Sequence, residues 1–296
     1  MLSLFLAAAA LQETSLSANN YTVDAPMPAH LQTVLWSDEF NGSRLDASKW
    51  QYDTSRNKEG WYNKELQYYA ANRIENLRVG GGNLTIELRK DPQEIRKFPD
   101  WGKQKYSSAK IVTQGKAAFQ YGFFEARAKL PCTRGSWPAF WMMPIGNEQW
   151  PQGGEIDILE HIGAQPGVVH ANLHTGKYNH TKQNGRGAQK PLPTSCSDFH
   201  RYQLSWTEDE ILIGVDDRAY MRVRNSEPGD RGAWPFDKPF YLILNLAMGG
   251  DWAGSKGIDD ASLPQKFEVD YVRVWEMPPV ADVSVPAPAG QAPKSN

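Results

Sequence analysis

Short runs in which apolar and polar residues alternate, separated by turns rich in Gly, Pro and Asn, fill most of the chain. Alternation with a period of two is typical of a strand with one buried face, and no dozen consecutive residues show a convincing 3.6-residue period. The pattern predicts an all-β protein with strands at residues 32–40, 83–88, 119–130, 170–174, 199–206, 211–215, 220–223, 240–248 and 265–275.

Two of these runs make different predictions about burial. In 119–130, apolar residues alternate with Glu125 and Arg127, which predicts one solvated face with a cross-strand charge ladder. The run 240–248 is apolar almost without a break, so both of its faces should be buried. Asn245 lies inside that second run and would need a hydrogen-bond partner.

Other segments are predicted to connect or anchor the strands. Residues 176–195 are rich in Gly, Lys, Asn, Gln and Pro and lack apolar periodicity, so we expect a long surface loop. Residues 63–69 are expected to form another loop, and Trp50 is expected to anchor the core.

The run from Gly154 to Gly163 places three acids among Ile and Leu residues. On a regular strand, Glu155 and Asp157 share one face and Glu160 points to the other. A β-bulge near Ile158 would add one unpaired residue and return Glu160 to the face of the first two acids. A helix is excluded, because positions i, i+2 and i+5 do not share a helical stripe.

These acids alone leave three interpretations open: a solvated strand face, a set of oxygen ligands for a cation, or a pair of catalytic carboxylates. Nearby, Trp137 and Trp141 are four positions apart and so share a face of the run 135–141. Flat aromatic rings beside paired acids suit sugar rings. Glu155 and Glu160 would lie about 13 Å apart along the strand, and inward-leaning side chains would close most of that gap.

The composition favours a neutral polymer as ligand. The chain has 296 residues, 40% hydrophobic content and a formal net charge of −2, and these values give no basic face for nucleic acid or an anionic membrane. Several of its 11 Trp and 12 Tyr adjoin Gly or Pro, which favours positions at loop rims. We expect a monomer with no nucleic-acid or membrane partner.

The two ends of the chain differ from its centre, and one domain is predicted over 21–276. Residues 1–20 resemble the apolar part of a signal peptide without the preceding Lys or Arg, and a disordered N-terminus is the alternative. Export to the periplasm or outside the cell would follow from a signal peptide. Residues 277–296 contain five Pro, which predicts a disordered tail or linker. Cys132 and Cys196 could form one disulfide, and the sequence does not show whether they do.

The sequence resembles glycoside hydrolase family 16, and within it the endo-β-1,3-glucanase (laminarinase) branch. The resemblance covers roughly residues 32–276 and is carried by 36–42, 63–69, 121–130, 137–141, 154–160, 245–250 and 269–274. It implies a jelly-roll β-sandwich of the concanavalin A-like type with a concave substrate cleft.

The resemblance also implies roles for the acids. Glu155 would be the nucleophile, Glu160 the acid/base and Asp157 the residue between them, in hydrolysis of β-1,3-glucan with retention by double displacement. The extra residue between the acids marks laminarinases, agarases and carrageenases within the family. No cofactor is implied for catalysis.

Substrate contacts and a metal site are implied in the same way. The substrate-binding residues would be Trp137, Trp141, Asn63, His174, Asn245, Trp252 and Lys110. Turn capping is the alternative for Asn63, and a structural role is the alternative for His174. Related enzymes tend to have Arg at position 110, and Lys lacks its two-pronged geometry. A structural Ca²⁺ would be held by Glu39, the Gly81 carbonyl and Asp270, which are otherwise ordinary surface residues.

Other functions remain open from the sequence. A mixed-linkage β-1,3-1,4-glucanase, an agarase-type galactanase and a transglycosylase would use the same fold and acids. A non-catalytic glucan-binding lectin is a different class, and the presence of both Glu155 and Glu160 disfavours it because such lectins typically lose them.

Overall fold

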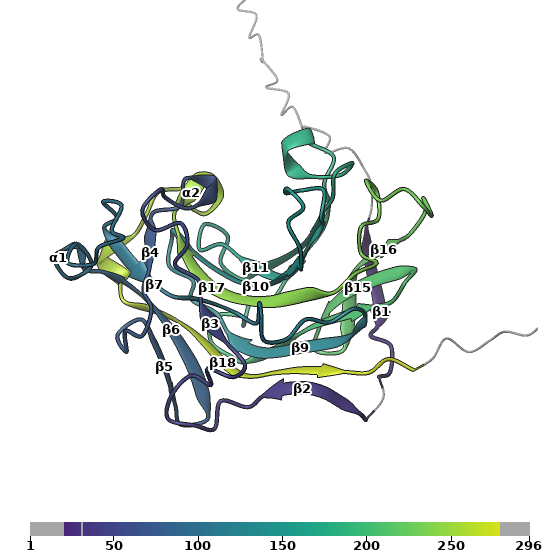
Figure 1. The fold of residues 1–296 in the computed structure, drawn as a ribbon, viewed down its shortest axis with the longest axis horizontal. Helices are drawn as coiled ribbons and strands as arrows, with labels where there is room; N and C mark the ends of the chain where they lie inside the picture. The colour runs from purple at the N-terminus through teal and green to yellow at the C-terminus, as the bar shows by residue number, and fades with distance from the viewer. Residues whose placement is uncertain (1–20, 31, 279–296) are drawn as a thin grey trace, which may run out of the picture.

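The computed structural model describes residues 21–30 and 32–278 (Figure 1). The predictions for 1–20 and for 279–296 therefore lie outside the described residues. The chain folds into two large sheets, as the predicted all-β jelly-roll requires. Within the described ranges, no helix has the length and apolar character needed to cross a membrane.

One sheet has seven strands and is strongly curved in Figure 1, where β17, β10 and β11 lie at the bottom of the curve. Its order is β13-β12-β11-β10-β17-β8-β3. The strands are β3 (Gln51–Tyr52), β8 (Lys110–Val112), β10 (Ser136–Pro144), β11 (Glu155–His161), β12 (Val168–His174), β13 (Arg186–Pro191) and β17 (Phe240–Met248).

The other sheet has eleven strands, and its strands β9, β18 and β2 lie below the first sheet in the view of Figure 1. Its strands are β1 (Thr22–Pro26), β2 (Val34–Asp38), β4 (Gln67–Tyr69), β5 (Leu77–Gly80), β6 (Asn83–Lys90), β7 (Tyr106–Ser108), β9 (Gly122–Lys129), β14 (His200–Trp206), β15 (Glu210–Val215), β16 (Arg218–Arg224) and β18 (Gln265–Trp275). The short helices are η1 (Tyr62–Lys64), α1 (Pro92–Ile95), η2 (His180–Lys182), α2 (Gly250–Ala253) and η3 (Asp260–Ser262).

The core lies between the sheets. It is built from the inward faces of both, with Phe140 and Leu244 contributed by the seven-stranded sheet and Phe124 by the other. Trp50 is only 1% exposed and donates its indole N–H to Asp38 Oδ2 at 2.9 Å, so its predicted role as a core anchor is confirmed. Strand β17 is buried at all but one of its positions, as its apolar run predicted.

The prediction of one solvated face for β9 is wrong over its first half. Phe123 is 2% exposed because it packs beside Trp275. Glu125 is 5% exposed and accepts hydrogen bonds from Tyr271 Oη at 2.7 Å and Gln203 Nε2 at 2.6 Å. The charge ladder is present further along, where β9 forms ion pairs with β18. These pairs are Arg127 with Asp270 and Lys129 with Glu268.

Two segments predicted as loops contain strands. Part of 176–195 forms β13, which pairs with β12 at the edge of the seven-stranded sheet, and part of 63–69 forms β4, which pairs in parallel with β7. Strand β13 reads Arg-Gly-Ala-Gln-Lys-Pro and has no alternating apolar face. Polar and charged residues of this kind are common on edge strands, so periodicity could not identify it.

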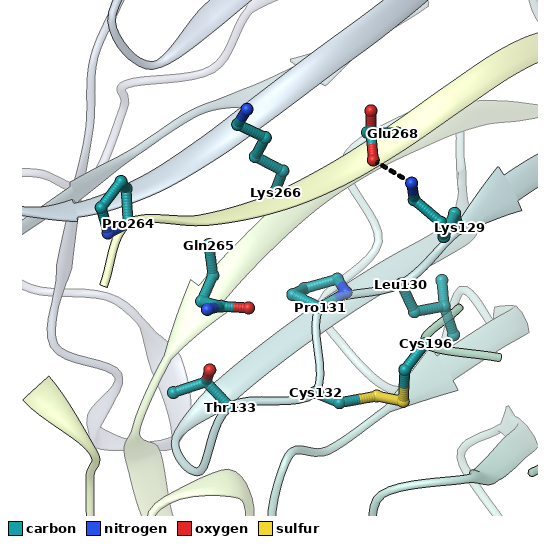
Figure 2. A pocket seen from close by; sticks show the side chains of 10 residues that line it. All are labelled: Lys129, Leu130, Pro131, Cys132, Thr133, Cys196, Pro264, Gln265, Lys266 and Glu268. Atoms are coloured by element: carbon teal, nitrogen blue, oxygen red, sulfur yellow. Dashed lines mark ion pairs between the residues drawn. A yellow bond between two sulfur atoms is a disulfide. The ribbon is translucent and has the colours of Figure 1, made fainter. Parts of the chain in front are cut away.

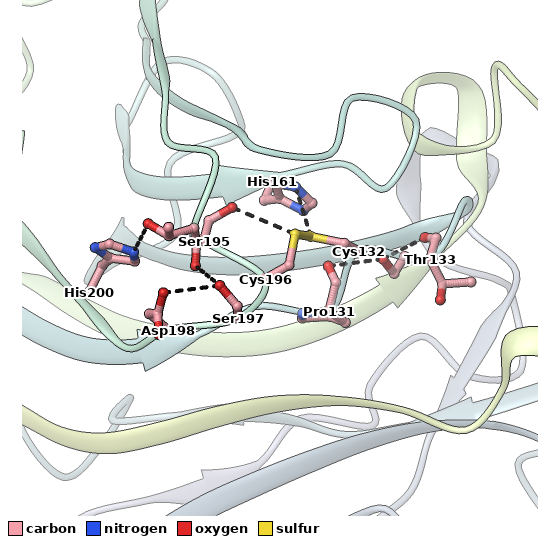
Figure 3. Close-up of a disulfide and its surroundings, with 11 residues drawn as sticks. Pro131, Cys132, Thr133, His161, Ser195, Cys196, Ser197, Asp198 and His200 are labelled. Carbon is pink, nitrogen blue, oxygen red and sulfur yellow. Dashed lines mark hydrogen bonds between the residues drawn. A yellow bond between two sulfur atoms is a disulfide. The ribbon is translucent and has the colours of Figure 1, made fainter.

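Cys132 and Cys196 form a disulfide with a Cα–Cα distance of 5.8 Å (Figure 3). The bond ties the turn before β10 to the turn before β14, and the Nε2 atom of His161 on β11 lies 3.5 Å from Cys132 Sγ. A pocket of about 380 Å³ opens beside it (Figure 2). None of the predicted site residues lines this pocket.

Candidate active site

Strand β11 contains the predicted bulge. Against β10, Leu159 pairs with Phe140 and Asp157 pairs with Trp141, so Ile158 has no partner. The pairing with β12 shifts over the same residues, between Asp157 and Glu160. Ile158 and Leu159 are both fully buried in the core. One extra residue therefore places Glu160 on the concave face with the other two acids.

Asp157 is the most buried of the three carboxyl groups, with 3% of its surface exposed. Burial raises the pKa of Asp157 well above its usual range, and the charges of Glu155 and Glu160 and a hydrogen bond to Glu155 raise it further. These effects favour the protonated form of Asp157, which is the form that can donate a hydrogen bond to Glu155. Its Oδ2 also lies 3.3 Å from Nε2 of His174 on β12.

Glu160 has an environment that nearly balances its two protonation states. Burial raises the pKa of Glu160 to about 7, opposed by His174, by Asn172 and by Trp137. Asn172 Nδ2 donates to Oε2 at 2.6 Å, and Trp137 Nε1 donates to Oε1 at 3.1 Å. A carboxyl group with a pKa near the working pH can give up a proton in one step and take one back in the next.

Two residues of the site were missed from the sequence. Trp150, in the turn before β11, donates its indole N–H to Oε2 of Glu155. Its ring also lies 5.9 Å from the ring of His174. Asn172 holds Glu160 as described above. The sequence contained a signal for Asn172. It lies two positions from both His170 and His174 along β12, and residues two apart on a strand share a face.

The predicted aromatic residues lie on the same face but are held by protein partners. Trp137 packs edge-on against Trp252, with ring centroids 5.2 Å apart. Trp141 donates to Asn245 Oδ1 at 2.7 Å, and Asn245 Nδ2 donates to Tyr69 Oη at 2.9 Å. The predicted need of Asn245 for a partner is thereby confirmed. These contacts fix the orientation of the rings that face the carboxylates.

Lys110 adjoins this cluster through its pairing with Asn245 in the sheet. Its Nζ lies 2.9 Å from Asp53 Oδ2, 4.8 Å from the ring centroid of Trp61 and 5.2 Å from that of Trp141. An ammonium group over two indole rings gains cation–π stabilisation. Lys110 therefore stabilises the position of the Trp141 ring.

Asn63 lies in η1 with a left-handed backbone (φ 54°), and its Nδ2 is 3.4 Å from Glu65 Oε1. The segment packs against the turn after β17, because a Cβ at Gly250 would lie 2.7 Å from the Asn63 carbonyl oxygen. That contact leaves room only for glycine and joins the Asn63 segment to the segment that carries Trp252.

The predicted calcium ligands lie outside this site. Glu39 accepts two hydrogen bonds from Arg273, and Asp270 pairs with Arg127 at 2.5 Å. Side chains neutralised by arginine do not fit a cation held through those carboxylates. A fall in melting temperature on chelation would indicate calcium there despite these ion pairs.

Paired carboxyl groups on a concave sheet face lined by tryptophan are typical of a glycoside hydrolase. The model of a protein family described as "Glycosyl hydrolases family 16" matches residues 64–273. The chain belongs to this family, as the sequence resemblance predicted.

Relatives and solved structures agree with that assignment. The "Beta-glucanase" of Rhodothermus marinus is 49% identical over 251 residues, which cover 82% of this chain and 84% of that protein. The structure of SCLam, a non-specific endo-beta-1,3(4)-glucanase, has a TM-score of 0.83 and 50% identity, with 87% of this chain and 96% of that chain covered. The laminarinase structure from Rhodothermus marinus has a TM-score of 0.77 and 46% identity, covering 83% of this chain and 98% of that chain.

Proposed function

We propose that the protein is a retaining endo-β-1,3-glucanase that cleaves laminarin-type glucan by double displacement. The observation that carries the proposal is the bulged strand β11, which sets Glu155, Asp157 and Glu160 on one face in different protonation environments. A relative that is 38% identical over 83% of this chain, from Cryptopygus antarcticus, is described as a glucan endo-1,3-beta-glucosidase.

In the first step, an oxygen of Glu155 attacks the anomeric carbon while Glu160 gives its proton to the departing glycosidic oxygen. The bond from the anomeric carbon to that oxygen breaks, and a glycosyl ester forms on Glu155. In the second step, Glu160 takes a proton from water as the water oxygen attacks the same carbon and releases Glu155. Two inversions restore the β configuration.

Asp157 and Trp150 prepare Glu155 for attack. Each presents a hydrogen to the Glu155 carboxylate, and Asp157 does so as a neutral group. A neutral neighbour leaves a single negative charge on the nucleophile pair, so attack does not have to overcome repulsion between two adjacent anions. These donors also restrict the rotation of the Glu155 side chain.

The test compares the wild type with Glu155→Ala and Glu160→Ala on laminarin, lichenan and agarose. The measurements are the release of reducing sugar and the anomeric configuration of the first product. We expect β-configured laminarin products from the wild type and a loss of turnover in both variants. Near-wild-type turnover by either variant would contradict the assigned roles.

A second substrate is favoured by the similarity to SCLam, whose structure is described as a non-specific endo-beta-1,3(4)-glucanase at 50% identity. We therefore propose mixed-linkage β-1,3-1,4-glucan as an additional substrate. Release of reducing sugar from lichenan in the same experiment tests it, and activity on laminarin alone would restrict the enzyme to β-1,3-glucan.

We also propose that the enzyme acts outside the cytoplasm as a monomer. The Cys132–Cys196 disulfide supports export, since such bonds persist in oxidising compartments, and a polymeric substrate cannot enter cells. Fractionation of the producing cells and gel filtration of the purified protein test these two points.

A further inference from the structure

Both oxygens of Glu160 accept a hydrogen bond from a neighbouring strand. Trp137 on β10 donates to Oε1, and Asn172 on β12 donates to Oε2 over the shorter distance of 2.6 Å. An N–H donor stabilises a carboxylate more than the neutral acid, so each donor opposes the effect of burial on this group. Asn172 is therefore placed to influence when Glu160 gains and loses its proton.

The Asn172 amide has this orientation because the next strand gives it room. Gly187 on β13 pairs directly with Asn172. A Cβ at Gly187 would lie 2.2 Å from Asn172 Oδ1, much closer than real Cβ contacts. Gly187 does not adopt a positive φ, so its backbone conformation is open to other residues and the amide is what requires glycine.

We propose that Gly187 and Asn172 are positioning residues that set the proton affinity of Glu160. Gly187 acts from the edge strand by leaving space for the amide oxygen, and Asn172 thereby aims its N–H at the acid/base. This inference rests on the proposed function, since it presumes that Glu160 is the acid/base.

The other groups facing Glu160 determine the direction of the effect. They are Glu155 and Asp157 on its own strand and His170 and His174 on β12; Tyr220 on β16 interacts with it electrostatically from the core. Burial raises the pKa of Tyr220 and lowers that of His170 to about 4, so both are neutral at pH 7. Glu155 raises the pKa of Glu160, whereas His174, Asn172 and Trp137 lower it.

Loss of the Asn172 donor should therefore make Glu160 hold its proton to higher pH. For Asn172→Ala we expect the alkaline limb of kcat/KM on laminarin to move up by about one pH unit, the size expected for one hydrogen bond to a charged group. Asn172→Leu keeps the shape of the side chain without the donor and should give the same shift. A merely structural role would lower activity at all pH values without moving the limb.

Gly187→Ala tests the second half of the inference without changing any group in contact with Glu160. We expect an alkaline shift in the same direction, because the new methyl group displaces the amide. In the Asn172→Ala background, Gly187→Ala should add no further shift, since the amide oxygen it would displace is gone. Gly185→Ala is the matched control, because its Cβ would meet nothing closer than 3.7 Å, and its profile should match the wild type.

The outcomes separate this inference from the proposed function. Unshifted alkaline limbs in folded Asn172→Leu and Gly187→Ala, or fully additive shifts in the double variant, would overturn the positioning role while Glu160→Ala remained inactive. Turnover retained by Glu160→Ala would instead overturn the proposed function itself. Melting curves establish that each variant is folded before its pH profile is measured.

Discussion

His174 and Asp157 face each other across neighbouring strands, with Nε2 of the imidazole 3.3 Å from Oδ2 of the carboxyl group. A hydrogen bond to Glu155 is among the effects that raise the pKa of Asp157. The buried aspartate thus links Glu155 to the histidine on β12. Its importance should come from the hydrogen it presents, because burial and the neighbouring acids disfavour its charge.

That account predicts different outcomes for two substitutions of Asp157. Asp157→Asn retains a donor of similar shape, so we expect kcat on laminarin to fall by about tenfold or less. Asp157→Ala removes the donor beside the reacting carboxylate, and a loss of about a hundredfold is expected. Steady-state kinetics of the two variants decide the question. An Asn variant as impaired as the Ala variant would mean that the charge of Asp157 is required.

The raised pKa of Glu160 predicts how stability depends on pH. A carboxyl group whose pKa is raised by folding binds more protons in the folded state, so its contribution is complete below the unfolded pKa and is lost as pH rises through the folded value. For Glu160 the window runs from 4.5 to about 7. The loss across it is on the order of 3 kcal/mol at most.

Glu160→Gln removes this titration while keeping the shape of the side chain. The free energy of unfolding of the wild type should therefore fall more between pH 4.5 and pH 8 than that of the variant. Urea unfolding at both pH values measures the difference. Parallel losses in the two proteins would show that Glu160 is not the group whose proton affinity changes on folding.

The sequence predicted the features that depend on local pattern. Strand 265–275 has the predicted bounds because apolar and polar residues alternate over most of its length. The bulge was predictable because three acids in one apolar strand share a face only if the register shifts once. Burial of β17 followed from its composition alone.

Features that depend on partners distant in the chain were not predictable. Strand β13 is recognisable only from its pairing with β12, since its own residues alternate poorly. Glu125 is buried because Tyr271 and Gln203 supply its hydrogen bonds from other strands. Likewise, no local pattern indicated that Glu39 pairs with Arg273, which is 234 positions away.

Trp150 provides a prediction about the nucleophile. Trp150→Phe keeps an aromatic ring and removes the N–H that donates to Glu155. The N–H fixes the orientation of the Glu155 carboxylate, and its loss should misplace the attacking oxygen, so kcat should fall by about ten- to a hundredfold. Trp234→Phe is the matched control, because its N–H donates to the Glu208 carbonyl instead. Equal effects on kcat in the two variants would argue against a role for the Trp150 N–H.

Trp141 provides a prediction about binding. Both Trp141→Ala and Trp141→Phe lose the hydrogen bond to Asn245, so the difference between them reports the aromatic ring alone. If the ring stacks on a glucosyl unit, the KM for laminarin should be about tenfold higher in the Ala variant than in the Phe variant. Indistinguishable KM values would remove Trp141 from the substrate-binding residues.

The disulfide should contribute to stability and leave the chemistry unaffected. Cys132 and Cys196 are 64 positions apart, and closing a loop of that size stabilises a fold by about 4 kcal/mol. We therefore expect the double variant Cys132→Ser/Cys196→Ser to unfold at a clearly lower urea concentration than the wild type. Under conditions in which the variant is folded, its kcat should stay within about twofold of the wild-type value, because no proposed step uses these residues. His161 touches Cys132 and directly follows Glu160, so a larger fall in kcat in the folded variant would show instead that the bond helps to position the acid/base.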